Sequence, residues 1–142
     1  MKLTTRKDIL EREAEAFPSL PTHTYEVVAQ SASRHPHRKA LTFFLQGDKY
    51  QKFVEWTYKA LLGEITAAAN MFRGLGIGDT DVVSYILPNT PETLLTVFGG
   101  ETAGIVNAIN PLLKAEQMVD IMQAAETKVL VTLAPFPQTD IW

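Results

Sequence analysis

The fold is decided by the stretch Gly76-Ile-Gly-Asp-Thr-Asp-Val-Val-Ser-Tyr-Ile-Leu-Pro-Asn-Thr-Pro-Glu92. Its opening glycines are typical of the end of a helix. The nearly unbroken apolar run that follows is typical of a strand covered on both faces. Thr90, Pro91 and Glu92 then combine a helix-capping residue, a proline at the first helical position and an acidic first turn. The stretch therefore predicts a helix end, a buried strand over Asp81–Leu87, a turn and a new helix.

Towards the C-terminus, strands and helices continue to alternate. The expected elements are a helix from Pro91 to about Gly104, a strand Ile105–Ile109, a helix Lys114–Ala125, a strand Lys128–Leu133 and a final loop Ala134–Trp142. Lys114 has no side-chain oxygen with which to cap a helix, so the helix after it is expected to begin one turn later or to begin less firmly. Three apolar strands joined by two helices predict right-handed βαβ units in a parallel sheet.

Towards the N-terminus, the pattern predicts helices and one hairpin. The expected elements are a helix Asp8–Phe17, a helix from Thr24, strands Lys39–Leu45 and Phe53–Thr57 around a Gly47-Asp48 turn, and a long helix Tyr58–Leu75 capped by Thr57. An apolar stripe runs along the long helix from Leu61 to Leu75. The fold class is therefore α/β: a β-hairpin and packing helices, followed by a partial parallel βαβαβ sheet. Residues 1–21 are expected to form an N-terminal helix and linker, and residues 22–142 an incomplete subdomain.

Composition excludes several classes of protein. The formal net charge of −3 argues against a nucleic-acid binder, which would carry a basic patch. No apolar run approaches the roughly 20 residues that span a bilayer. The start of the chain lacks the apolar core of a secretory signal. The absence of cysteine excludes disulfides and thiolate chemistry, and it favours a cytoplasmic location.

The only candidate binding residues are Asn89 and Thr90. They follow a predicted parallel strand at the start of a helix, where backbone amides can hold an anion. The alternative, which the lack of a neighbouring basic side chain favours, is that they only shape the turn and cap the helix. Gly74-x-Gly-x-Gly78 has neither the spacing nor the strand-first order of a dinucleotide fingerprint, so it is interpreted as a helix cap. His35 and His37 are interpreted as solvated loop residues; no metal ligand and no catalytic residue is assigned.

Seven short motifs, in order, resemble the start of the large N-terminal domain of AMP-forming acyl-CoA synthetases. They are Arg34-His-Pro-His-Arg-Lys-Ala-Leu41, Trp56-Thr-Tyr-Lys-Ala-Leu-Leu62, Phe72-Arg-Gly-Leu-Gly-Ile-Gly-Asp79, Ile86-Leu-Pro-Asn-Thr-Pro-Glu92, Ala103-Gly-Ile-Val106, Ile109-Asn-Pro111 and Ala124-Ala-Glu-Thr-Lys-Val-Leu-Val131. The resemblance covers residues 22 to 133. It rests on the order and spacing of the motifs, since each alone is weak.

The resemblance implies a ligase that joins a carboxylate to ATP and passes the acyl group to a thiol. ATP, Mg²⁺ and coenzyme A are implied for such an enzyme, but its phosphate loop, adenine-binding motifs and catalytic lysine have no matching positions here. This chain alone is therefore expected to be an inactive scaffold for the remainder of the synthetase chain. Exposed apolar surface or an open sheet edge would also favour a homodimer. A stand-alone interaction module and a small-ligand binding domain are the alternatives.

Overall fold

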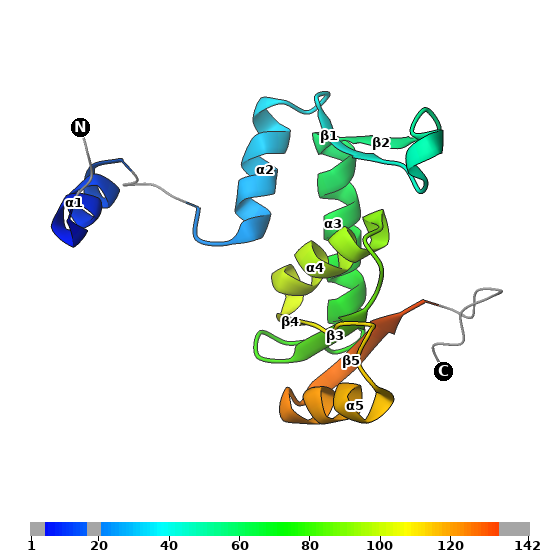
Figure 1. The fold of residues 1–142 in the computed structure, drawn as a ribbon. Coiled ribbons are helices and arrows are strands. Elements are labelled where there is room, and N and C mark those ends of the chain that lie inside the picture. The colour runs from blue at the N-terminus through cyan, green and yellow to red at the C-terminus, as the bar shows by residue number, and fades with distance from the viewer. Residues whose placement is uncertain (1–4, 17–20, 134–142) are drawn as a thin grey trace.

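The computed structural model describes residues 5–16 and 21–133. Its elements are α1 (Arg6–Ala16), α2 (Thr24–Arg34), β1 (Lys39–Phe43), η1 (Gly47–Lys49), β2 (Val54–Thr57), α3 (Tyr58–Gly74), β3 (Val82–Ile86), α4 (Pro91–Ala103), β4 (Ile105–Ala108), α5 (Ala115–Ala124) and β5 (Thr127–Thr132). Figure 1 shows α1 apart from the other elements, the β1–β2 hairpin at one end of α3, and the sheet at the other end. No helix in the described ranges is long and apolar enough to cross a membrane.

The strands form two separate sheets, which confirms the predicted α/β class. β1 and β2 pair antiparallel as the expected hairpin. β3 lies between β4 and β5, and both of its neighbours run parallel to it. The central position of β3 explains its continuous apolar run. Figure 1 shows α4 and α5 on opposite sides of this sheet, so the strand has a layer on each face.

A glycine in the left-handed region ends α3. Gly76 has φ of 83°, which a residue without a Cβ adopts at little cost. Its N–H donates to the Arg73 carbonyl at 3.0 Å, and the Ile77 N–H donates to the Phe72 carbonyl at 3.0 Å. The two hydrogen bonds together make a Schellman cap. The interpretation of these glycines as a helix cap is therefore confirmed. Leu75, expected to extend the apolar stripe, is exposed instead because the chain already turns at this residue.

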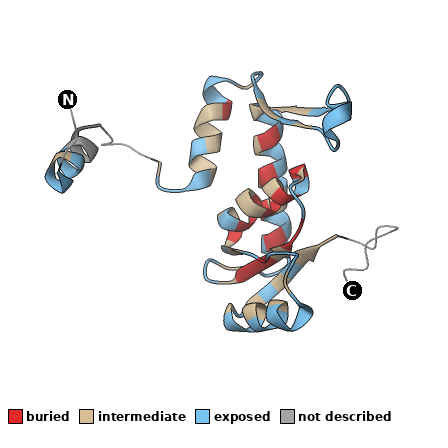
Figure 2. Cartoon of the chain, viewed as in Figure 1, coloured by how far each residue is buried: buried red, intermediate tan, exposed pale blue. Residues whose placement is uncertain are grey.

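The core lies where α3 and α4 meet the parallel sheet, as the buried residues in Figure 2 show. Phe72, Ile77, Val83 and Ala103 form its buried centre. Val129 and Val131 of β5 pack against this centre. Because Ile77 follows the Schellman cap directly, the cap also places an apolar side chain against Phe72.

The expected late start of α5 is wrong. The helix begins at Ala115, directly after Lys114. The Lys114 N–H donates to the Gln117 side-chain oxygen at 3.1 Å. Gln117, three residues into the helix, thus supplies the reciprocal half of a capping box, and no oxygen is needed on the lysine.

A polar network joins all three parallel strands. Ser84 of β3 is fully buried. Its hydroxyl accepts a hydrogen bond from the Asn107 side-chain amide of β4 at 2.9 Å. It shares a second one with the Thr127 hydroxyl of β5 at 2.6 Å. The buried hydroxyl is therefore satisfied from both sides, as buried polar groups usually are.

Replacing Ser84 with alanine is expected to destabilise the protein by about 1–3 kcal/mol, because the Asn107 amide loses its acceptor. Urea unfolding followed by circular dichroism measures the loss. Ser33→Ala, at an exposed position of α2, is the control and is expected to stay within about 0.5 kcal/mol of the wild type. Equal stability of the two variants would show that the network contributes nothing.

An ion pair joins the loop before β3 to β5. The Lys128 ammonium donates to the Asp81 carboxylate at 2.8 Å and to the Gly76 carbonyl at 2.7 Å. The Gly78 N–H donates to the same carboxylate oxygen at 2.6 Å. The Lys128 hydrogen bond, with that of Gly78, holds the pKa of Asp81 below its ordinary value of 3.8. The carboxylate therefore favours the folded state only while it is ionised.

Asp81→Asn is expected to lower the free energy of unfolding at pH 7, where the Asp81 carboxylate is ionised. A group whose pKa is lower in the folded state contributes stability above its unfolded pKa and loses it as the pH falls through the folded pKa. The difference between wild type and variant should therefore shrink below about pH 4. Urea unfolding at pH 7, 5 and 3 tests this, with Asp120→Asn on the exposed surface of α5 as control. A difference in the free energy of unfolding that is as large at pH 3 as at pH 7 would contradict the assignment to this carboxylate.

Candidate functional site

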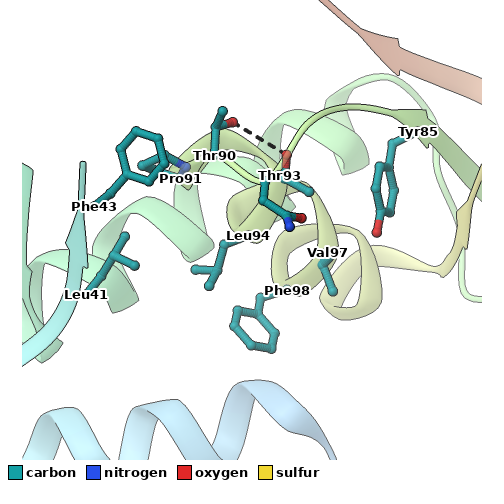
Figure 3. A pocket seen from close by; sticks show the side chains of 10 residues that line it. Leu41, Phe43, Tyr85, Thr90, Pro91, Thr93, Leu94, Val97 and Phe98 are labelled. Carbon is teal, nitrogen blue, oxygen red and sulfur yellow. Dashed lines mark hydrogen bonds between the residues drawn. The ribbon is translucent and has the colours of Figure 1, made fainter. Parts of the chain in front are cut away.

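A mostly apolar hollow of about 390 Å³ opens between the hairpin, the carboxyl end of β3 and α4 (Figure 3). It contains both candidate residues of the sequence analysis and several that the sequence analysis did not single out. The residues that line it are Leu41, Phe43, Tyr85, Asn89, Thr90, Pro91, Thr93, Leu94, Val97 and Phe98.

Each wall of the hollow follows from the spacing of its residues. Leu41 and Phe43 alternate along β1, so both project to the same side of the strand. Leu94, Val97 and Phe98 recur at helical spacing and share one face of α4. Figure 3 shows Leu41 and Phe43 on the hairpin side of the hollow, and Leu94 and Phe98 on the α4 side. The hairpin and α4, far apart in the sequence, thus form opposite walls.

The loop between β3 and α4 is held by its own hydrogen bonds. The Thr93 hydroxyl donates to the Pro88 carbonyl. The Thr90 N–H donates to the same carbonyl at 2.8 Å. Thr90 occupies the N-cap position, but the expected side-chain cap bond is not formed. Its hydroxyl instead contacts the Thr93 hydroxyl at 3.5 Å, because Thr93 has already turned towards the loop.

The structure brings Asn89 and Thr90 to the same hollow. Asn89 is exposed, and its amide has no hydrogen-bond partner among the described residues. The helix start beside them is a poor anion site, because the Thr93 and Leu94 N–H groups both donate to the Thr90 carbonyl. Glu92 adds a negative charge in the same turn. A role for Asn89 and Thr90 in binding a ligand stays a prediction.

The hollow does not fit Mg·ATP. None of the ten residues that line it carries a positive charge, whereas a triphosphate requires cationic or clustered amide donors. Within residues 5–11 and 21–133, no group of three or more His, Asp or Glu residues could hold a metal ion. His35 and His37 are both exposed. The chemistry of this surface is that of an apolar contact with one exposed amide at its edge.

Comparison with known proteins identifies the family. The model of a family described as AMP-binding enzyme matches residues 28–141, most of the chain. The chain belongs to the AMP-binding enzyme family. Family membership confirms the resemblance on which the sequence analysis relied. Curated proteins to which the chain is similar include acyl-CoA ligases.

Two curated relatives show how much of the length of an acyl-CoA ligase this chain covers. Marinolic acid–CoA ligase of Pseudoalteromonas sp. (strain SANK 73390) is 31% identical over 105 residues, which is 74% of this chain and 16% of the relative. Crotonobetaine/carnitine–CoA ligase of Salmonella arizonae is 35% identical over 115 residues, which is 80% of this chain and 22% of the relative. The chain thus spans about a fifth of the length of these enzymes.

Solved structures share the fold. A fatty acyl CoA synthetase of Mycobacterium tuberculosis superposes with a TM-score of 0.67 at 22% identity, over 78% of this chain and 21% of that one. The N-terminal subdomain of Klebsiella oxytoca NpsA, in complex with anthranilyl-AMSN, superposes with a TM-score of 0.66 at 17% identity, over 81% of this chain and 28% of that one. The arrangement of hairpin, helices and parallel sheet therefore matches part of the fold of these proteins, including that of the NpsA N-terminal subdomain.

Proposed function

We propose that this chain is the scaffold portion of an AMP-forming acyl-CoA ligase. Its sheet and helices would support the remainder of the synthetase chain, which is its principal partner. The family match over residues 28–141 carries this proposal. The lack of cationic side chains in the hollow supports it, because the nucleotide then needs residues from elsewhere in the enzyme.

The wider assignments follow from the same family. ATP, Mg²⁺ and coenzyme A would be bound by the complete ligase, and a cytoplasmic location fits a chain without cysteine. The boundary between an N-terminal helix with its linker and the ligase-like part is proposed at residues 21 and 22. Figure 1 supports this boundary, because α1 lies apart from α2 and from all the elements that follow it.

Within the ligase, we assign the hollow to the path of an apolar acyl group. Leu94 and Phe98 of α4 and Phe43 of β1 offer apolar surface, and burial of a chain of methylene groups there is favourable by about 0.8 kcal/mol per group. Asn89 at the edge offers an amide for a polar substituent.

ATP–pyrophosphate exchange tests the scaffold proposal. The isolated, folded chain is expected to show no exchange above a blank with Mg·ATP and a panel of carboxylic acids, and no saturable binding of ATP, AMP or coenzyme A by calorimetry. The ligase that contains this chain should show exchange that depends on the carboxylic acid. Robust exchange by the isolated chain would overturn the scaffold role.

A substitution in the hollow tests the acyl path separately. In the complete ligase, Leu94→Asp is expected to raise KM for apolar acids by about tenfold or more, since it buries a charge against the acyl group. Leu112→Asp is the matched control, because Leu112 is exposed and lies outside the hollow. Equal kinetics of the two variants would remove the hollow from the acyl path and leave the scaffold proposal unaffected.

A second copy of this chain is the alternative partner. Ile105 on β4 and Leu130 on β5 are both exposed, and each lies on an outer strand of the three-stranded sheet. Open edges of this kind pair readily with other strands. Sedimentation velocity over a range of concentrations separates a homodimer from a monomer that needs the rest of the ligase.

A further inference from the structure

The tip of the β1–β2 hairpin, residues 44–54, exposes a cluster of large apolar side chains. Leu45 is 80% exposed and Tyr50 59% exposed. Phe44, Phe53 and Val54 are about half exposed. Among the large exposed apolar residues of the described ranges, every aromatic one lies on this tip. Figure 2 shows the hairpin reaching away from the buried core, and none of these five residues belongs to that core.

Two lysines accompany the aromatic side chains. Lys49 and Lys52 surround a small hollow of about 210 Å³ together with Leu45 and Gln46. Neither ammonium makes an ion pair with a described residue, whereas Lys39, nearer the body, is paired with Glu55 at 2.7 Å. Asp48 is the only acid on the tip. The tip thus carries a net positive charge in a chain whose net charge is −3.

This combination fits the boundary of an anionic lipid bilayer. Aromatic side chains favour the level of the lipid headgroups, where one part of the ring is apolar and the other wet. Lysines keep their ammonium groups at the surface while their stems lie along apolar groups. Each lysine near an anionic surface strengthens binding by about fivefold. We propose that the hairpin tip docks this protein on anionic membranes.

A protein partner fits the tip less well. The centres of protein interfaces are depleted of lysine. In a symmetric dimer joined tip to tip, two surfaces of net positive charge would meet, and like charges would oppose the contact. Lipid phosphates, in contrast, complement both lysines. The inference goes beyond the ligase role and does not depend on it.

Vesicle co-sedimentation of the 142-residue chain tests the proposal. The chain is expected to sediment with vesicles of phosphatidylcholine and phosphatidylglycerol, and to bind pure phosphatidylcholine about tenfold less. The double variant Leu45→Ser/Phe53→Ser should lose binding. Lys49→Gln and Lys52→Gln should each weaken binding to the anionic vesicles by about fivefold. A higher salt concentration should also weaken this binding, because salt screens the attraction between the lysines and the lipid phosphates. Circular dichroism verifies that each variant is folded.

Leu112→Ser is the matched control, because Leu112 is 89% exposed but lies between β4 and α5. It should bind vesicles as the wild type does. The proposal is overturned if the wild-type chain stays in the supernatant with anionic vesicles, or if the hairpin variants bind as the wild type does. It is equally overturned if vesicle binding is absent and Leu45→Ser/Phe53→Ser dissolves a dimer in sedimentation velocity, which would assign the tip to self-association.

Discussion

Gly99→Val is expected to destabilise the protein by about 3 kcal/mol, a large part of the stability of an ordinary domain. Gly99 lies on α4 where this helix crosses α3. A Cβ at this position would lie 2.6 Å from the Ala68 Cβ and 3.1 Å from the Ala69 backbone nitrogen. Because the α3 backbone cannot rotate away as a side chain can, the two helices must separate, and their shared core opens.

Gly63→Ala is the control for the Gly99 variant. Gly63 lies within α3, and a Cβ there would meet no atom within 4 Å. Alanine at this position is expected to stabilise the protein by up to about 1 kcal/mol through its better helix propensity. Urea unfolding measures the free energy of unfolding of both variants and of the wild type. If Gly99→Val is as stable as the wild type, the close contact between α3 and α4 is not a constraint.

Phe72→Ala is expected to cost about 3–5 kcal/mol, the range for truncation of a buried aromatic residue. Phe72 is 1% exposed and packs with Ile77, Val83 and Ala103. Its loss would leave a cavity beside the Schellman cap and under the central strand. Met71→Ala is the neighbouring control: Met71 is exposed, so its loss should cost less than about 1 kcal/mol. Similar losses for the two variants would contradict the position of the core.

The sequence predicted the parallel sheet best, because each of its elements carries a local signal. The apolar run before Leu87 indicated a strand covered on both faces, and β3 is the central strand. Glycine at position 76 indicated a helix end, and its φ of 83° confirms it. Pattern alone did not give the order β4-β3-β5, because strand order depends on which side of β3 each crossover returns to.

Two expectations about how helices begin were wrong. Thr90 was expected to cap α4, but its hydroxyl contacts Thr93, whose own hydroxyl is bound to Pro88. Lys114 was expected to delay α5, but Gln117 caps the helix from the other side. In both cases the outcome depends on the hydrogen bonds of the residue three positions further along the chain. The capping preference of a single residue does not include this information.

The candidate site was predicted in part. Asn89 and Thr90 were singled out, and both line the hollow. Leu41 and Phe43, which complete it, were missed because they lie far away in the sequence. The alternation of these two residues along a strand was the one available signal. This alternation indicated that one face of the strand packs against another element, but it did not indicate that this element is α4.

The mass of the endogenous protein tests the central claim most directly. An antibody raised against this segment would capture the protein from its source for intact mass measurement. As the scaffold portion of a ligase, the segment should occur in a protein several times larger than 15.8 kDa, since the chain spans 16% and 22% of two relatives. A mass of 15.8 kDa would contradict the account and assign the chain a function of its own.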